Sequence, residues 1–190
     1  MTLAPINIRI SPETYLDGEK KSDVKHEYDN GYVVAMVGAS RSHNLIALTL
    51  ASTIKQHIKG KPCRAYISDM KVRIQTQTND IFYYPDVMVS CDRNPSSEYY
   101  EDKPVLIIEV LSPSTETRDK LEKLAAYSRI PSLVEYLTIA QDKVEIHRYS
   151  ISEGAVLLTE YQDGDVIEFL SIDLTMPAKD VYADVIGKVL

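Results

Sequence analysis

Residues Val105–Leu111 read V-L-I-I-E-V-L, and this stretch decides how the rest of the chain can fold. Six of the seven residues are aliphatic, and Pro104 and Pro113 bound the run on its two sides. A short aliphatic run with such boundaries is typical of a strand that is buried on both faces. Glu109 is the exception, because a buried carboxylate loses its hydration unless it meets a cation or hydrogen-bond donors.

Two interpretations of Glu109 are open at this point. The strand reaches the end of its sheet at Glu109 and the side chain is lifted into water, or the protein uses a buried negative charge. A second carboxylate close to Glu109 would favour the second interpretation.

The bulk composition is typical of one soluble globular domain. The chain has 190 residues, of which 44% are hydrophobic and 26% are charged,. The first ten residues lack the charged start and long apolar run of a sorting signal, and no window approaches 18 consecutive apolar residues,. We therefore expect a cytoplasmic protein with no membrane span. The net charge of −7 argues against a protein that coats nucleic acid nonspecifically, but not against an enzyme with a local basic track,.

The chain contains two cysteines, Cys63 and Cys91. They follow no metal-binding spacing, and a disulfide framework is not expected from two cysteines in a protein of this kind. We expect two reduced, inert thiols.

Periodicity and turn residues predict an order of helices and strands along the chain. The succession of strand, helix and strand around residues 105–139 predicts two parallel strands joined by a right-handed crossover. The helix of that crossover has Leu121, Leu124 and Ala125 as its apolar stripe,. The expected elements are a helix over 12–17, a hairpin turning at Asn30-Gly31, a helix from Ser40 or Ser42 to Lys59 with Leu45, Leu48, Ile54 and Ile58 among its buried positions, strands over 63–67, 70–75, 86–90 and 105–111, a helix from Ser114 or Thr115 to Ser128, a strand over 133–139, and hairpin strands over 144–149, 156–161 and 166–169,.

A second acidic residue occupies a strand position among apolar neighbours. Asp86 follows Pro85 at the start of an expected strand, 23 positions before Glu109. If the two strands pair, the carboxylates can converge at one end of the sheet, where they need a cation or a raised pKa on one of them. Oxygen ligands favour a hard ion such as Mg²⁺ or Mn²⁺.

Pro85-Asp86, followed by Glu109 inside an aliphatic strand, resembles the motif of the PD-(D/E)XK nuclease superfamily. More closely, the chain resembles a bacterial family of restriction-endonuclease-like domain proteins within that superfamily. The resemblance covers about residues 10–150, most of the chain. The matching segments are Glu27 with Gly31 and Met36, Ser40 with His43, Pro85-Asp86-Val87, Glu109-Val110-Leu111-Ser112-Pro113-Ser114-Thr115, Asp119 with Lys123 and Tyr127, and Glu135-Tyr136.

The resemblance implies an α/β (α+β) fold with a restriction-endonuclease-like mixed central β-sheet flanked by helices and with additional β-hairpins at both ends. We expect a single domain over residues 1–190. Its core spans about residues 40–150, an N-terminal helix and hairpin span 10–38, and a C-terminal hairpin spans 143–170.

The resemblance also implies a metal site and a catalytic lysine. Asp86, Glu109 and the carbonyl oxygen of Val110 would hold Mg²⁺, with Mn²⁺ as a substitute. The superfamily pattern places a lysine two residues after the acidic residue, but position 111 is leucine. In the resembling family the lysine comes from the following helix, which here is Lys123. The helix pattern alone favours a different interpretation, a solvent-exposed ion pair between Lys123 and Asp119.

Three further residues are candidates for supporting roles. Glu27 could complete the site directly or through water, and Asp119 could pair with Lys123. His43 lies in the first turn of its helix, where it could contact a phosphate, cap the helix or pack as a ring,.

The function implied is a Mg²⁺-dependent endonuclease that hydrolyses phosphodiester bonds of DNA. A homodimer is expected because two copies of a one-site domain are needed to cut both strands of a duplex. Two alternatives stay open. One is a nucleic-acid-binding or regulatory module that keeps the nuclease fold without turnover, and the other is a metal-dependent hydrolase of RNA or a nucleotide.

Overall fold

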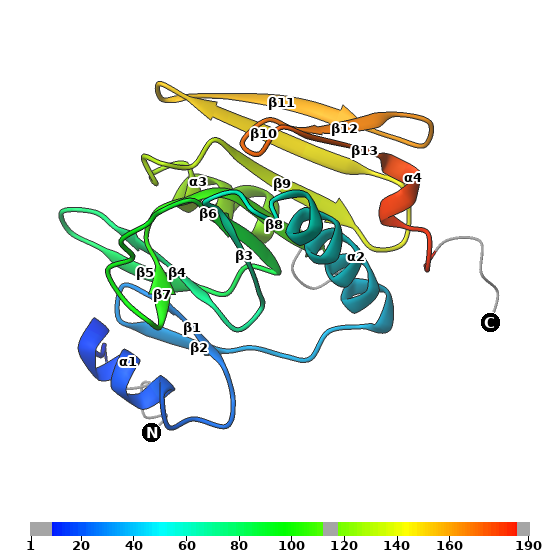
Figure 1. Cartoon of the computed structure of the whole chain (residues 1–190). Coiled ribbons are helices and arrows are strands. Elements are labelled where there is room, and N and C mark those ends of the chain that lie inside the picture. The colour runs from blue at the N-terminus through cyan, green and yellow to red at the C-terminus, as the bar shows by residue number, and fades with distance from the viewer. Residues whose placement is uncertain (1–8, 112–117, 186–190) are drawn as a thin grey trace.

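Two β-sheets form the centre of the fold (Figure 1). The structure is a computed structural model that describes residues 9–111 and 118–185, with residues 118–120 described by their backbone alone. The five-stranded sheet A contains, in spatial order, β2 (Tyr32–Ala35), β1 (His26–Asp29), β5 (Asp80–Tyr83), β4 (Lys71–Gln75) and β7 (Tyr100–Glu101). The six-stranded sheet B contains β11 (Ala155–Tyr161), β10 (Ile146–Ser152), β9 (Glu135–Ala140), β8 (Pro104–Leu111), β6 (Val87–Ser90) and β3 (Arg64–Ile67).

The stretch that opens the sequence analysis is β8, a central strand of sheet B. It pairs antiparallel with β6 and parallel with β9, so the expected parallel pairing and the mixed sheet are both confirmed. Leu106, Ile108 and Val110 pack on the face covered by α2 (Arg41–His57), whereas Ile107 packs on the opposite face. Because side chains alternate along a strand, Glu109 shares the face of Ile107, which is turned toward sheet A.

Helices α1 and α2 cover the outer faces of the two sheets. Helix α2 and the C-terminal segment cover sheet B, and α1 (Pro12–Glu19) covers sheet A through Tyr15. The side chains of Ser11 and Ser40 cap the two helices by accepting a hydrogen bond from the backbone of the first turn, as expected,. Helix α1 continues past Gly18 to Glu19, and Leu48 of α2 is exposed rather than buried.

The crossover helix presents a different face from the one expected. Its described part consists of η1 (Arg118–Lys123), a π-helix, and α3 (Leu124–Tyr127), while residues 114–117 of the expected helix lie outside the described part of the chain. Leu121 is 67% exposed, so the expected apolar stripe is wrong. The wider turn of a π-helix changes which side chains face the sheet, and here Lys123 and Tyr127 face inward,.

The strand expected over 86–90 is present as β6, whereas β5 was not predicted. β5 ends at Tyr83 and β6 begins at Val87, and between them the chain passes from sheet A to sheet B. The expected state of the two cysteines is wrong. Cys63 and Cys91 form a disulfide instead of two free thiols. The antiparallel pairing of β3 with β6 brings them together, because their neighbours Arg64 and Ser90 are opposite one another.

Hairpins complete both ends of the described chain. The turn between β1 and β2 has Asn30 and Gly31 at φ of 46° and 97°, the backbone that a tight hairpin requires,. Strands β10 and β11 form the expected C-terminal hairpin, and β12 (Val166–Phe169) pairs with β13 (Leu174–Pro177), a strand that the sequence analysis did not predict. The last helix is α4 (Ala178–Val181). None of the helices in the described residues is long and apolar enough to cross a membrane.

Candidate active site

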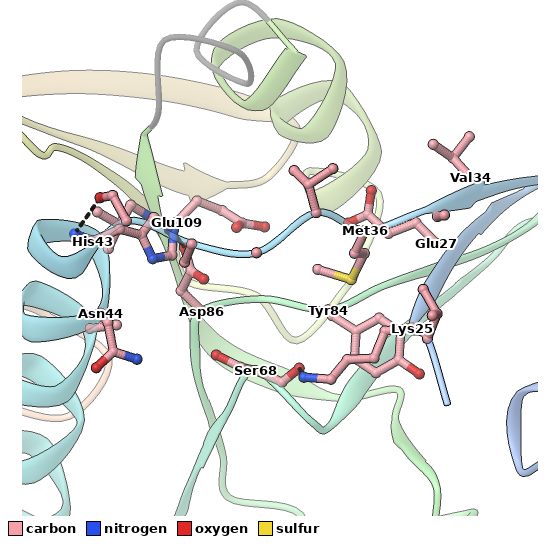
Figure 2. Close-up of a pocket in the computed structure, with 18 of the residues that line it drawn as sticks. Lys25, Glu27, Val34, Met36, His43, Asn44, Ser68, Tyr84, Asp86 and Glu109 are labelled. Atoms are coloured by element: carbon pink, nitrogen blue, oxygen red, sulfur yellow. Dashed lines mark hydrogen bonds and ion pairs between the residues drawn. The ribbon is translucent and has the colours of Figure 1, made fainter. Parts of the chain in front are cut away.

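A pocket of about 770 Å³ opens where the two sheets and α2 meet. Its lining includes Glu27 from β1, Asp86 from the passage between the sheets, Glu109 and Val110 from β8, and Lys123 from η1. Figure 2 shows the side chains of Asp86, Glu109 and His43 gathered on one side of this pocket, with Glu27 and Val34 on the other. Residues from distant parts of the sequence therefore share one site.

Lys123 occupies a buried position between two carboxylates. Its Nζ lies 2.8 Å from Oε1 of Glu109 and 3.2 Å from Oε1 of Glu27. All three residues are buried, since Glu109 is 3%, Glu27 4% and Lys123 5% exposed. The interpretation of Lys123 as a solvent-exposed lysine is wrong, because the π-helix turns it toward the sheet. Glu109 is likewise buried, and the ammonium of Lys123 is the cation that a buried carboxylate in this strand needs,.

Tyr127 adds a second donor to Glu109. Its hydroxyl donates to Oε1 of Glu109 at 2.7 Å, the same oxygen that Lys123 contacts. Tyr127 is fully buried, and its ring packs edge-on against Tyr83 and tilted against Tyr136. Burial, and then the negative charge of Glu109, raise the pKa of Tyr127 well above its ordinary value. The tyrosine therefore stays a protonated donor that fixes the orientation of Glu109.

Asp86 is held by the strand that carries Glu109. Its Oδ2 accepts a hydrogen bond from the backbone N–H of Val110 at 2.7 Å, and Nε2 of His43 lies 3.0 Å from the same oxygen. The Asp86 side chain is 14% exposed, and that of His43 is 16% exposed. Both contacts use Oδ2, so Oδ1 is the Asp86 oxygen that can face a bound cation.

The structure gathers most of the residues singled out in the sequence. Those that line the common pocket are Asp86, Glu109, Val110, Lys123, Glu27 and His43. Asp119 lies in η1, and its side chain is outside the described residues. Nε2 of His43 contacts Asp86, and the three interpretations of His43 stay predictions. Tyr127 was named only as part of the family pattern, although its spacing of four residues from Lys123 would place both on one helix face.

The charges of this site suit a cation. Glu27, Asp86 and Glu109 carry three negative charges, against which Lys123 provides one buried positive charge. Buried charges are tolerated only when they are compensated, so the excess of carboxylates favours a divalent ion. Among the described residues, no group of three or more His, Cys, Asp or Glu is arranged to hold a metal by side chains alone. A cation would therefore take the two carboxylates of Asp86 and Glu109, a backbone carbonyl and water, which is the ligand set that Mg²⁺ commonly accepts.

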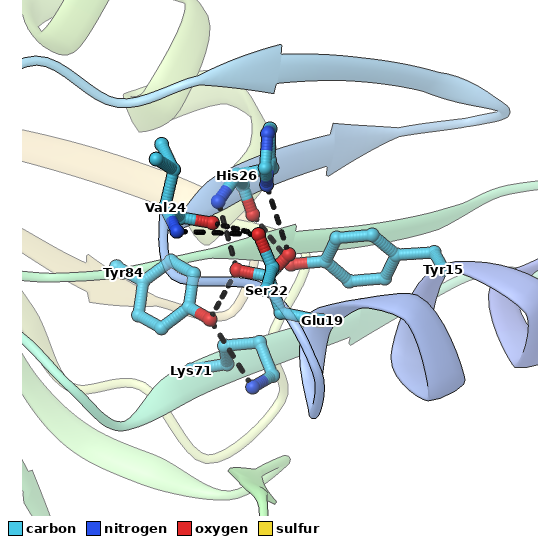
Figure 3. Close-up of polar contacts among 7 residues, drawn as sticks. All are labelled: Tyr15, Glu19, Ser22, Val24, His26, Lys71 and Tyr84. Atoms are coloured by element: carbon cyan, nitrogen blue, oxygen red, sulfur yellow. Dashed lines mark hydrogen bonds and ion pairs between the residues drawn. The ribbon is translucent and has the colours of Figure 1, made fainter.

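A second buried polar cluster positions the segments that carry Glu27 and Asp86 (Figure 3). Glu19, at the end of α1, accepts hydrogen bonds from the backbone N–H of His26 at 2.8 Å and from the hydroxyl of Tyr84 at 2.9 Å. His26 precedes Glu27, and Tyr84 lies two residues before Asp86. Through these two hydrogen bonds Glu19 connects the residues that come just before Glu27 and Asp86, although it does not line the pocket.

Lys71 completes this cluster from β4. Its Nζ donates to the hydroxyl of Tyr84 at 3.3 Å, and it is 7% exposed. Burial lowers the pKa of Lys71, while the charge of Glu19 works in the opposite direction. The hydroxyl of Tyr84 accepts from Lys71 and donates to Glu19, so both of its bonds depend on these two residues.

Replacing Glu19 by alanine is expected to reduce both stability and the endonuclease activity that the sequence analysis predicts. The substitution leaves the His26 N–H and the Tyr84 hydroxyl without their acceptor, which costs about 1–3 kcal/mol for a buried group. Urea unfolding measures the first effect and plasmid nicking the second. Glu13→Ala, at an exposed position of the same helix, is the matched control. Equal activity of the Glu19 and Glu13 variants would contradict a positioning role for Glu19.

The mixed sheet, the flanking helices and the paired carboxylates define a protein with the restriction-endonuclease-like fold. The chain belongs to the Uma2 family, whose model is described as "Putative restriction endonuclease" and matches residues 12–178. This membership confirms the resemblance seen in the sequence and makes the chain a nuclease-like protein.

Individual proteins agree with this assignment. The uncharacterized protein slr1290 of Synechocystis sp. is 37% identical over 176 residues, covering 92% of this chain and 92% of the relative. A second uncharacterized protein of that organism, sll1609, is 32% identical and covers 84% of this chain and 91% of its own. The crystal structure of "a putative nuclease belonging to DUF820" from Anabaena variabilis matches with a TM-score of 0.65 and 19% identity, over 88% of this chain and 97% of its own. At that identity the structural match supports the fold alone.

Proposed function

We propose that the protein is a Mg²⁺-dependent endonuclease that hydrolyses phosphodiester bonds of DNA. The observation that carries this proposal is the position of Lys123, which reaches Glu109 and Glu27 from the neighbouring helix, in the pocket that Asp86 also lines. A surface ion pair would not require a buried lysine. A lysine beside convergent carboxylates is the arrangement that the family resemblance requires.

Each residue of the site has its own role in the proposed hydrolysis. Asp86, Glu109 and the Val110 carbonyl would hold Mg²⁺, which when bound polarises a phosphate and activates a water. Hydrolysis joins the oxygen of water to phosphorus and breaks one P–O ester bond, and a proton from the water ends on the leaving hydroxyl. The ammonium of Lys123 would neutralise the charge that develops on the phosphate oxygens. Tyr127 and Glu27 hold Glu109 and Lys123 in place for these roles.

Substituting Asp86 by asparagine tests the proposal. Supercoiled plasmid is incubated with the purified protein and Mg²⁺ or Mn²⁺, and nicking is followed on a gel. We expect Asp86→Asn to reduce nicking by about a hundredfold or more, because even residues behind the metal ligands change activity by 10–100-fold. The amide oxygen of asparagine can still accept from Val110, so the fold should be retained.

Asp163→Asn, in an exposed turn, is the control for this substitution. No nicking by the wild-type protein, or equal nicking by wild type and Asp86→Asn, would contradict the endonuclease. Saturable DNA binding without any cleavage would instead support the non-catalytic module. The homodimer stays a prediction, which the mass of the protein in solution tests.

A further inference from the structure

The disulfide between Cys63 and Cys91 lies at one edge of sheet B. Among the described strands, β3 is the last in this sheet and pairs with β6 alone. Cys63 comes directly before β3 and Cys91 directly after β6, so the bond joins the two strands at one end of their pairing. Both cysteines are only partly buried, so the bond lies near solvent. A thiol in solution can therefore approach it in the folded protein.

Strand β3 has little buried surface of its own. None of its four residues is buried, whereas all four residues of β6 are. Ile67, at the end of β3, is 52% exposed, and Ala65 and Tyr66 pack only partly against the two hydrophobic cores. Strands with few buried contacts open at a small cost in free energy. The disulfide therefore adds a constraint to a strand that packing holds weakly.

The other end of β3 contacts the candidate active site. Ile67 pairs with Val87, the residue that directly follows Asp86. The backbone N–H of Ser68 donates to the carbonyl oxygen of Asp86 at 3.3 Å, and Ser68 lines the pocket. Figure 2 shows Ser68 between Asp86 and Lys25, whose Nζ donates to the Ser68 carbonyl oxygen at 3.2 Å. Strand β3 thus connects the disulfide to the backbone of a proposed metal ligand.

The disulfide also closes the part of the chain that carries Asp86. Cys63 and Cys91 are 28 positions apart, and the segment between them contains β3, β4, β5, Asp86 and β6. In the chain-entropy description, a disulfide acts by restricting the open states of the segment that it closes. Breaking the bond therefore favours states in which β3 has left β6.

We propose that Cys63 and Cys91 form a redox switch that controls how firmly β3 holds the segment of Asp86. In the oxidised protein the disulfide keeps β3 on β6 and Ser68 on Asp86. In the reduced protein β3 opens more often, and the Asp86 carbonyl then loses its hydrogen bond from Ser68. The switch goes beyond the proposed nuclease function, and its effect on cleavage alone rests on that function.

The reductant is a dithiol, and the exchange balances. A thiolate of the dithiol attacks one sulfur of the Cys63–Cys91 bond, and the other sulfur leaves as a thiolate and takes up a proton. The second thiol of the reductant then attacks the mixed disulfide and releases the second cysteine. Two electrons and two protons pass to the cysteines, and the dithiol becomes a disulfide.

Hydrogen–deuterium exchange of the full chain, oxidised and then reduced with dithiothreitol, tests the switch. Alkylation of free thiols and mass spectrometry establish the state of the two cysteines in each sample. We expect the amides of β3 to exchange about tenfold faster or more after reduction, and those of β8 and β9 to change by less than about twofold. Equal exchange of β3 in the two samples would overturn the switch. So would a bond that dithiothreitol leaves intact in the folded protein, or two thiols that stay free after treatment with oxidised glutathione.

Plasmid nicking with Mn²⁺ tests the link to the active site. The oxidised protein should cut about fivefold faster or more than the reduced protein, because displacement of a group in an active site lowers the rate. The double variant Cys63→Ser with Cys91→Ser should behave as the reduced protein and should not respond to dithiothreitol, which controls for binding of Mn²⁺ by the reductant.

The two measurements keep the possible failures apart. If neither form cuts DNA, the proposed function fails, and the exchange of β3 still decides the switch. If β3 exchanges faster after reduction but both forms cut equally fast, the control of Asp86 by β3 is overturned and the proposed function stands. A response of the double variant to dithiothreitol as large as that of the wild type would show that Cys63 and Cys91 are not the switch.

Discussion

Replacing Lys123 by methionine is expected to reduce the proposed metal-dependent cleavage strongly and also to destabilise the fold. Lys123 is 5% exposed and lies between Glu109 and Glu27, so its removal leaves two buried carboxylates without their common cation. Breaking a buried ion pair from one side costs about 3–5 kcal/mol. Removing one charge-stabilising group from an active site typically reduces kcat by about 10²–10³-fold.

Urea unfolding and plasmid nicking measure the two effects. Lys55→Met, at an exposed position of α2, is the control and should change neither. A double variant, Lys123→Met with Glu27→Gln, separates structure from catalysis. It removes one of the two uncompensated charges, so it should recover part of the lost stability without recovering cleavage. If the double variant regained activity, the role of Lys123 would be to compensate charge in the folded protein and nothing more.

Replacing Glu109 by glutamine is expected to remove activity with a smaller change in stability. Glutamine has nearly the same shape, and its amide oxygen can still accept from Lys123 and from Tyr127,. The substitution does remove the negative charge that would bind the metal. Since residues behind a metal ligand already change affinity 10–100-fold, we expect Mn²⁺ binding to weaken by about a hundredfold or more.

Isothermal titration with Mn²⁺ measures this affinity directly, and nicking measures activity in parallel. Glu98→Gln, at an exposed position, is the control. Unchanged Mn²⁺ affinity in Glu109→Gln would mean that Glu109 is a partner of Lys123 and not a metal ligand. A loss of stability as large as that of Lys123→Met would show that the charge of Glu109, and not its shape, holds the fold.

The sequence predicted the central strand and its neighbours well, because their signals are local. The aliphatic run of β8, the Asn30-Gly31 turn and the two serine caps each depend on a few adjacent residues, and the structure confirms them. Parallel pairing of β8 with β9 followed from the strand, helix and strand order. These features could be predicted because none of them depends on contacts between residues far apart in the sequence.

The position of Lys123 could not be predicted from helix periodicity. A regular helix with Leu121 and Leu124 turned inward would have pointed Lys123 to solvent, and a π-helix reverses this. The resemblance to a nuclease family pointed to Lys123, which lies beside Glu109, and its catalytic role stays a prediction. The partners of Tyr127 likewise depend on the docking of α3 against both sheets.

Contacts between distant segments account for what the sequence analysis missed. It predicted β6 but not β5, because the run from Ile81 to Ser90 is continuous in sequence and nothing local marks the change of sheet at Tyr84-Pro85-Asp86 as more than a turn. The disulfide between Cys63 and Cys91 depends on the pairing of β3 with β6, which the sequence did not predict.

Lys123 contacts one carboxylate from each sheet, Glu27 from β1 and Glu109 from β8. Neither sheet alone contains the arrangement, so a partial unfolding that separates the β1–β2 hairpin from sheet B would dismantle the site while β8 stays paired with β6 and β9. The amide protons of that hairpin should therefore report, through their exchange with solvent, the fraction of molecules in which the site is assembled.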